Sequence, residues 1–373
     1  WNKGMQEIVA VAKRENNSRR NYLVLNRLQA KHVPASPKRA LDYFEELAGQ
    51  VKEKFGGERL LLVGFAETAT GIGAALAVKL KTAYMQTTRE EIDGVDFLNF
   101  TEVHSHAAQQ KLVRDDLEEI IGRIDRIVFV EDELTTGNTI GNIVSLIRES
   151  FPFPVKFAAA SLINGMDDKG LEKFCREDIA LCFLQKADYC DFPRRAEAVK
   201  GDGEYFPAHP LGEVQQRKAL DVESWKASDY INARRLTNGA SYARACESLW
   251  EQFLSVNGRI CKKRILVLGT EEIMYPALFL GKCLEKDNEV ICHGTTRSPI
   301  LVSSEPDYLL YRRYELVSLY AQERKTFVYN LKAYDQVFVV TDTPALNREG
   351  WDGLVWALWQ SGNRKIQLIR WCC

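Results

Sequence analysis

Short, largely apolar runs that alternate with helix-like segments constrain the fold of this chain most strongly. Leu60–Phe65 carries no charge and leads into a loop and a helix-like segment, and Arg126–Val130 precedes a polar loop in the same way. Unbroken apolar runs of this length are typical of strands buried on both faces, as in parallel sheets. Similar runs occur at Thr82–Thr87, Phe157–Ile163 and Ile179–Leu184. The alternation predicts an α/β fold whose mostly parallel sheet is flanked by helices.

The length of 373 residues and one change of composition indicate two domains. Prolines and glycines are concentrated between residues 190 and 215, where we place the boundary. We therefore expect a first α/β domain over 1–195, a linker and helical segment over 196–261, and a smaller second α/β domain over 262–373. Within the second domain, the aromatic-rich stretch 308–325 is interpreted as a helix used for packing.

The sequence of the second domain resembles that of the first in three segments. The matched segments are Gly64–Glu67 with Gly269–Glu272, Thr87–Arg89 with Thr295–Arg297, and Asp125–Asp132 with Asp335–Asp342. The matches keep their order and nearly constant spacing, which favours a degenerate internal repeat; chance similarity between buried strands is the alternative. A repeat predicts that Glu272 and Arg297 lie at the carboxyl ends of adjacent parallel strands. There they either pair or, as we slightly favour, both face a ligand.

One segment of the first domain carries the strongest functional signal. An apolar strand ends in Glu131 and Asp132, and the turn Thr135–Thr139 then leads into a helix. Gly137 permits a backbone geometry in which successive N–H groups point at one anion, and the threonine hydroxyls and the helix N-terminus add donors. The carboxylates suit the two hydroxyls of a ribose or a magnesium ion. A simple helix N-cap is the alternative, but a cap does not need this combination of residues.

This segment resembles the signature of type I phosphoribosyltransferases, which use 5-phosphoribosyl-1-pyrophosphate (PRPP), and the resemblance extends over roughly residues 20–190. It implies that Glu131 and Asp132 act in catalysis by holding the ribose hydroxyls, with Mg²⁺ bound by them directly or through ribose or water. The resemblance also implies a 5′-phosphate loop (Thr135, Thr136, Gly137, Asn138, Thr139), a pyrophosphate loop (Glu67, Thr68, Ala69, Thr70, Gly71), and a mobile loop, Ile92–Lys111, with its flank (Arg89, His104, His106, Lys111).

A closer likeness is to phosphoribosyltransferase-like proteins encoded with tellurite-resistance operons. Their first domain carries the loop sequence found at Gly64–Thr70 and the His-Ser-His-Ala segment found at His104–Ala107. Their second domain is named TRSP after the sequence found at Thr296–Pro299. The resemblance implies Mg²⁺-dependent transfer of phosphoribose from PRPP to an unidentified base-like acceptor, with release of pyrophosphate, in the synthesis of a nucleoside-like metabolite.

Two departures from the family pattern matter. The loop Ala66–Gly71 has no basic residue and contains Glu67, which keeps two other functions open: a non-catalytic PRPP or nucleotide sensor, and an interaction module in a stress-response complex. Thr135 stands where relatives that act on purines can carry an aspartate base, which disfavours a 6-oxopurine acceptor. At the matching strand ends of the second domain lie Glu272, Thr296, Arg297 and Ser298. These residues are either a relic of the repeat without function or the candidate acceptor site.

The charge and cysteine content of the chain limit the kinds of molecule that it can bind and the compartment in which it can act. The chain has 50 basic and 51 acidic residues, so it lacks the bulk basicity of a nucleic-acid binder. No apolar run is long enough for a membrane helix. Nine cysteines without a CxxC motif disfavour a disulfide framework and a zinc site, and indicate a reduced cytoplasm. We expect PRPP and a small-molecule acceptor as partners, no nucleic acid and no membrane, and leave a homodimer open.

The acidic run Asp115–Glu119 is interpreted as a solvated helix face.

Overall fold

The computed structural model describes residues 8–15, 17, 20–100, 110–208 and 222–373. These residues form two compact units. The first unit comprises Leu41–Tyr189 and Ile231–Ala245, and the second comprises the chain up to Ala40, Cys190–Tyr230 and Cys246–Cys373. Neither unit is therefore continuous in the sequence.

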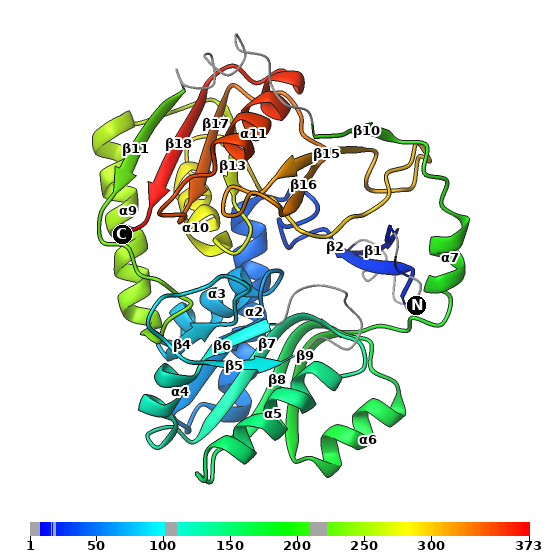
Figure 1. Cartoon of the computed structure of the whole chain (residues 1–373), viewed down its shortest axis with the longest axis vertical. Helices are drawn as coiled ribbons and strands as arrows, with labels where there is room; N and C mark the ends of the chain where they lie inside the picture. Colours follow the sequence, from blue (N-terminus) through cyan, green and yellow to red (C-terminus); the bar gives the residue numbers. More distant parts are fainter. Residues whose placement is uncertain (1–7, 16, 18–19, 101–109, 209–221) are drawn as a thin grey trace. The chain divides into compact units, whose positions relative to one another are not determined.

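A six-stranded sheet forms the centre of the first unit (Figure 1). Its strand order is β12-β4-β3-β7-β8-β9, and all neighbours are parallel except β12, which is antiparallel to β4. The strands are β3 (Leu60–Gly64), β4 (Ala83–Gln86), β7 (Arg126–Leu134), β8 (Lys156–Asn164), β9 (Ile179–Lys186) and β12 (Thr237–Asn238). Every residue of β3 is buried, as its unbroken apolar run predicts.

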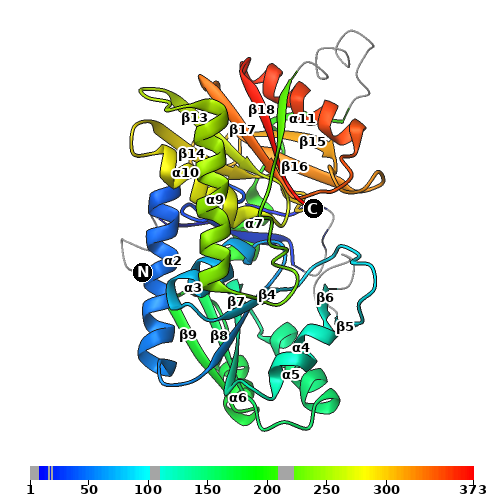
Figure 2. The same ribbon diagram turned by 90° about the vertical axis from the view of Figure 1, so that its left-hand side faces the viewer.

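Helices connect these strands and confirm the predicted α/β alternation. They are α2 (Pro37–Phe55), α3 (Thr70–Leu80), α4 (Arg114–Ile121), α5 (Asn138–Ser150) and α6 (Asp168–Arg176), with an antiparallel ribbon of β5 (Phe97–Phe100) and β6 (Gln110–Val113) between β4 and α4. Helix α3 packs on β3 and β4 (Figure 2). Gly73 permits this close approach, because a Cβ atom there would lie 2.8 Å from the Cα of Gly64.

The acidic run Asp115–Glu119 is not a uniformly solvated helix face, contrary to the sequence-based interpretation. Asp116 is only 5% exposed. Both of its carboxylate oxygens accept hydrogen bonds from the Arg235 guanidinium at 2.7 Å. The backbone N–H of Leu236 donates a third, also at 2.7 Å. This carboxylate anchors the distant segment 231–245 to α4, which is a tertiary contact that the local charge pattern does not reveal.

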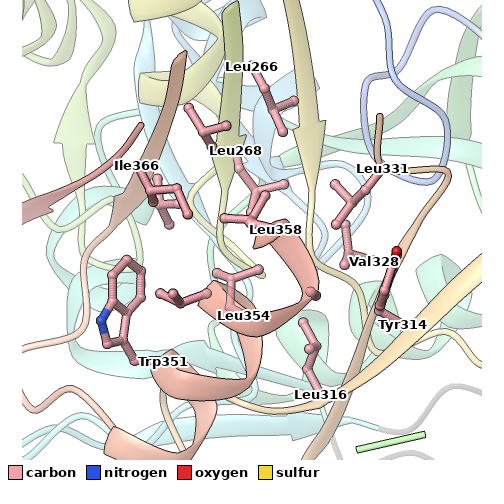
Figure 3. Close-up of a cluster of buried hydrophobic side chains, with 14 of the residues drawn as sticks. Leu266, Leu268, Tyr314, Leu316, Val328, Leu331, Trp351, Leu354, Leu358 and Ile366 are labelled. Carbon is pink, nitrogen blue, oxygen red and sulfur yellow. The ribbon is translucent and has the colours of Figure 1, made fainter. Parts of the chain in front are cut away.

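The second unit is built around a five-stranded, all-parallel sheet with the order β14-β13-β17-β18-β11. The strands are β11 (Glu223–Ala227), β13 (Arg264–Gly269), β14 (Glu289–Gly294), β17 (Gln336–Thr341) and β18 (Ile366–Trp371). The helices are α7 (Phe192–Ala198), α10 (Met274–Leu284), α11 (Arg348–Gln360) and the part of α9 (Gly239–Asn257) that follows Ala245. Leu266 and Leu268 of β13 form one buried cluster with Trp351, Leu354 and Leu358 of α11 (Figure 3).

Residues 308–325 are not the packing helix that the sequence analysis expected. They contain β15 (Arg312–Val317), which pairs antiparallel with β16 (Lys325–Tyr329) and parallel with β10 (Glu204–Phe206). Tyr314 and Leu316 both belong to the buried cluster of Figure 3. The Tyr314 ring stacks on Phe206 at a centroid distance of 4.7 Å. Burial at a spacing of two residues is the period of a strand, which the other aromatic residues of the stretch obscured.

Four strands of the second sheet repeat four strands of the first, as the sequence repeat predicts. The order β4-β3-β7-β8 corresponds to β14-β13-β17-β18 in space and along the chain, whereas the next strand is β9, which follows β8, in the first sheet and β11, which precedes β13, in the second. The Thr87 N–H donates to the Gly64 carbonyl at 2.9 Å, and the Thr295 N–H donates to the Gly269 carbonyl at 3.1 Å. The second unit is therefore a degenerate copy of the first.

The correspondence extends to the ribbon that follows the second strand of each copy. Thr88 forms an antiparallel bridge with Lys111, next to the ribbon β5–β6, and Thr296 forms one with Phe327, next to the hairpin β15–β16. The hairpin of the second unit thus occupies the place of the ribbon in the first. Residues 101–109, between β5 and β6 in the sequence, lie outside the described residues.

The N-terminal residues up to Ala40 pack in the second compact unit, and the predicted domain bounds 1–195, 196–261 and 262–373 stay a prediction. Strands β1 (Val9–Lys13) and β2 (Tyr22–Asn26) form a two-stranded antiparallel sheet. Leu23 and Leu25 pack in one buried cluster with Ile300 and Tyr329. A two-stranded sheet is too small to bury its own apolar face, so it needs a partner from elsewhere in the chain. Here that partner comes from residues almost 300 positions later.

His293 at the end of β14 gives the second unit a testable pH dependence. Complete burial lowers the pKa of this imidazole from 6.5 to about 4. The folded state then resists protonation, so stability should fall by about 3 kcal/mol as the pH drops from 6.5 to 4. Urea unfolding at several pH values, followed by tryptophan fluorescence, measures this, because all seven tryptophans belong to the second unit. His293→Gln should flatten the profile; parallel profiles would contradict the assignment.

Candidate functional site

The predicted 5′-phosphate loop Thr135–Thr139, called the cradle below, spans the turn between β7 and the start of α5. Gly137 is the N-cap of α5 and adopts a left-handed conformation, with φ at 70°. Gly137 makes no side-chain cap, the Thr136 hydroxyl accepts the Asn138 N–H at 3.3 Å, and the first turn carries no acidic residue. The other N–H groups of the first helical turn lie at a helix N-terminus, which favours negative charge.

The positively charged side chain of Lys173 lies at the edge of this cradle. The Lys173 ammonium on α6 donates a hydrogen bond to Oδ1 of Asn138 at 2.9 Å. Asn138 was predicted as part of the 5′-phosphate loop, whereas Lys173 was not predicted. No local motif identifies Lys173, since only the packing of α6 against the sheet brings it near the turn.

The acidic pair lies beside the cradle, in the last part of β7. Glu131 and Asp132 are both half-buried, and β7 continues past them to Leu134. The Thr68 hydroxyl donates a hydrogen bond to Oδ1 of Asp132 at 3.0 Å. The structure thus brings the loop after β3 into direct contact with the acidic pair, as the carboxyl ends of neighbouring parallel strands allow.

The loop after β3 contains the predicted pyrophosphate-loop residues. Glu67 is 5% exposed, and Thr70 and Gly71 already belong to the first turn of α3. The hydroxyl of Thr70 donates to the carbonyl of Glu67 at 3.3 Å. Just before the loop, the Ala66 N–H donates to the Thr87 hydroxyl at 2.8 Å. The loop is therefore fixed at both ends.

The predicted mobile loop and its flank are described only in part. Lys111 lies on β6 and forms an ion pair with Glu91. Arg89 follows Thr88, whose backbone pairs with that of Lys111, so both basic residues belong to this corner of the first unit. His104 and His106 lie outside the described residues.

The matching corner of the second unit is filled by its own charged side chains. Arg297 contacts Glu271 at 2.8 Å and Glu272 at 3.6 Å, and both carboxylates are almost completely buried. Arg324, near the tip of the β15–β16 hairpin, contacts Glu271 at 3.0 Å. Glu272 and Arg297 thus form an ion pair, which is one of the two arrangements that the sequence analysis considered. Thr296 accepts a hydrogen bond from the Ser298 N–H at 3.2 Å. A role for these residues as an acceptor site stays a prediction.

Comparison with known families decides the identity of the chain. Residues 8–181 match the family described as phosphoribosyl transferase, and residues 237–358 match the family described as the TRSP domain C-terminal to that transferase. Residues 8–181 thus belong to the phosphoribosyl transferase family. Its members are glycosyltransferases, and the TRSP-type phosphoribosyltransferase predicted from the sequence motifs is confirmed. No curated protein matches this phosphoribosyl transferase chain.

Several solved structures are similar to part of the chain. Adenine phosphoribosyltransferase from Rhodothermus marinus is 12% identical, with a TM-score of 0.37 over 50% of this chain and 97% of that one. The adenine enzyme from Thermoanaerobacter pseudethanolicus is 19% identical, with a TM-score of 0.37 over 50% and 99%. Orotate phosphoribosyltransferase from Aeropyrum pernix is 16% identical, with a TM-score of 0.31 over 49% and 90%.

The phosphoribosyl transferase site offers few ligands for a metal ion. Among the described residues, no group of three or more His, Cys, Asp or Glu side chains could hold one. Glu131 and Asp132 provide hard oxygen donors of the kind that Mg²⁺ prefers, but two carboxylates fill only part of an octahedral shell. The residues fit a Mg²⁺ ion that takes its other ligands from substrate and water.

Two further observations concern membrane helices and cysteines. In the part of the chain described, no helix is both long and apolar enough to cross a bilayer. The nine cysteines are all free thiols.

Proposed function

We propose that the protein transfers phosphoribose from PRPP to a base-like acceptor and releases pyrophosphate. One observation carries the proposal: the Thr68–Asp132 hydrogen bond joins a pyrophosphate-type loop to the acidic pair that precedes an anion cradle. A 5′-phosphate in the cradle and a pyrophosphate at the loop would then place the ribose beside Glu131 and Asp132. This is the arrangement that bond cleavage at C1 of PRPP requires.

The side chains would act mainly by positioning and by charge. The cradle Thr135–Thr139 would hold the 5′-phosphate through backbone N–H groups and hydroxyls. Glu131 and Asp132 would accept hydrogen bonds from the ribose hydroxyls and so fix the sugar ring. Their negative charges would also stabilise the cationic, oxocarbenium-like ribose that forms as pyrophosphate leaves.

The second unit indicates how Arg89 could serve the leaving group. Arg297 stands at the position of Arg89 in the repeat and reaches the Glu271 carboxylate at 2.8 Å. Ala66 stands at the position of Glu271 and has no carboxylate. We therefore propose that the pyrophosphate of PRPP occupies, in the first unit, the place that the Glu271 carboxylate takes in the second. Arg89 would then bind an anion there, although the loop itself has no basic residue.

Magnesium and the acceptor belong to the proposal as well. A Mg²⁺ ion held by Glu131 and Asp132, directly or through ribose or water, would neutralise charge on the pyrophosphate leaving group. Thr135 cannot serve as a general base, so the acceptor would be a base that needs no deprotonation by this residue. An acceptor at Arg297 would have to replace the carboxylates that this side chain already contacts. With its free thiols, the protein would act in the reducing cytoplasm, and its proposed setting is tellurite resistance.

Calorimetric titration separates this function from its alternatives. With Mg²⁺ present, the wild-type protein should bind PRPP, ribose 5-phosphate and pyrophosphate. An enzyme should also release pyrophosphate when PRPP is offered with a panel of nucleobase-like acceptors, which a PRPP sensor would not do. Absence of binding to all three ligands would refute both the transferase and the sensor and leave the interaction module.

A further inference from the structure

Gln110 is a buried glutamine whose amide group clamps the residue before the pyrophosphate loop. It begins β6 and is 1% exposed. Its Nε2 donates a hydrogen bond to the Ala66 carbonyl at 2.6 Å, and its Oε1 accepts one from the Thr87 hydroxyl. That hydroxyl also accepts the Ala66 N–H at 2.8 Å. Both backbone polar groups of Ala66 are therefore held by Gln110 and Thr87.

The second unit holds the same backbone groups with a different side chain. Glu271 stands at the position of Ala66, and its N–H donates to the Thr295 hydroxyl at 2.9 Å. Thr326 stands at the position of Gln110, as the bridge of its neighbour Phe327 to Thr296 shows. The carbonyl of Glu271 instead accepts a hydrogen bond from the buried Lys31 ammonium. Both copies thus place a buried donor on this carbonyl, although the donors come from unrelated parts of the chain.

A buried donor, Gln110 in one unit and Lys31 in the other, bonds the carbonyl at this position in both units. We infer that the orientation of the peptide that follows Ala66 is important. In the second unit these hydrogen bonds hold the backbone of Glu271, whose carboxylate forms ion pairs with Arg297 and Arg324. In the first unit the corresponding hydrogen bonds hold the loop that contacts Asp132 through Thr68. A buried amide that donates to the Ala66 carbonyl and accepts from the Thr87 hydroxyl resists rotation of the loop's first peptide, because any rotation would leave buried polar groups unpaired.

We infer that Gln110 is a positioning residue for the pyrophosphate-binding loop. The inference rests on the proposed function and makes it more specific. The hydrogen bonds of Gln110 to Ala66 and Thr87 lie at the start of the pyrophosphate loop, so it would act on the pyrophosphate end of PRPP and not on the 5′-phosphate end. Ligands that carry only one of the two ends can therefore test it.

The test compares pyrophosphate and ribose 5-phosphate binding by calorimetry, with Mg²⁺, for the wild type and Gln110→Met. Methionine keeps the length of the side chain and removes both hydrogen bonds. We expect pyrophosphate affinity to fall by about 10-fold or more, and ribose 5-phosphate affinity to change by less than about 2-fold. Gln86→Met removes another buried glutamine of the same unit and should change neither affinity by more than about 2-fold.

Each outcome distinguishes this inference from the function on which it rests. Equal pyrophosphate affinity in the wild type and Gln110→Met, or an equal loss for both ligands, would overturn the positioning role while leaving the proposed function intact. A wild type that binds neither ligand would overturn the proposed function. If Gln110→Met does not fold, Thr87→Val breaks the same clamp and should show the same selective loss, with Thr87→Ser restoring pyrophosphate affinity.

Discussion

Replacing Asp132 by Asn is expected to lower phosphoribosyl turnover by about 10²–10³-fold while the first unit stays folded. The amide keeps the size of the side chain and can still accept the Thr68 hydrogen bond. It removes the negative charge that would stabilise the cationic ribose, and it offers an N–H group where the ribose hydroxyl also donates. Steady-state pyrophosphate release measures the loss. Circular dichroism checks that the fold is retained, which we expect because Asp132 is only half-buried.

The repeat supplies a matched control for this substitution. Asp342 stands at the position of Asp132 in the second unit and accepts hydrogen bonds from the hydroxyls of Tyr320 at 2.6 Å and Tyr230 at 3.2 Å. Asp342→Asn should leave turnover within about 2-fold of the wild type. If both variants lose turnover equally, the acidic pair of the first unit has no special role, and the proposed mechanism fails.

Replacing Gly137 by Ala is expected to destabilise the first unit by about 3 kcal/mol. A Cβ atom at this position would lie 2.4 Å from Cε1 of Phe174 and 2.9 Å from the sulfur of Met166. Both side chains are at most 2% exposed, so they have little room to move. The positive φ of 70° adds the strain of a left-handed conformation for a residue with a side chain. The same change should abolish ribose 5-phosphate binding, because the cradle shifts with its glycine.

Gly94→Ala separates the two contributions to this loss. Gly94 has a similar φ of 73° and belongs to the same unit, but nothing lies within 4 Å of an added Cβ. It should therefore cost only the conformational strain, about 1 kcal/mol, and leave ligand binding unchanged. Chemical denaturation followed by circular dichroism compares the two variants. Equal losses would show that the contact with Phe174 does not constrain the turn.

Features that depend on local sequence were predictable in this protein. The apolar runs at Leu60 and Arg126 mark true parallel strands, because a strand buried on both faces needs apolar residues without alternation. Gly137 was identified because only the turn that it permits explains a glycine between threonines at a helix start. The repeat was visible because matched polar residues at strand ends are not required by burial alone.

Features that depend on distant packing were not predictable. The strand β15 resembled a helix because its aromatic residues also fit a helical spacing, and only pairing with β10 and β16 decides between the two. Asp116 looked solvated because its partner, Arg235, is more than 100 residues away in the sequence. In the candidate site, Lys173 and Gln110 escaped notice for the same reason, since neither belongs to a motif.

The interleaving of the two units has a consequence for how this protein can evolve and be handled. Residues up to Ala40 complete the second unit, and Ile231–Ala245 complete the first. A single cut anywhere in the chain therefore cannot yield two intact halves: a fragment ending at Tyr189 keeps β1 and β2 without their apolar partners and loses the arginine that pairs with Asp116. Gene fission or domain shuffling at the apparent boundary would produce two damaged proteins. The second unit is thus inherited with the first as one indivisible polypeptide.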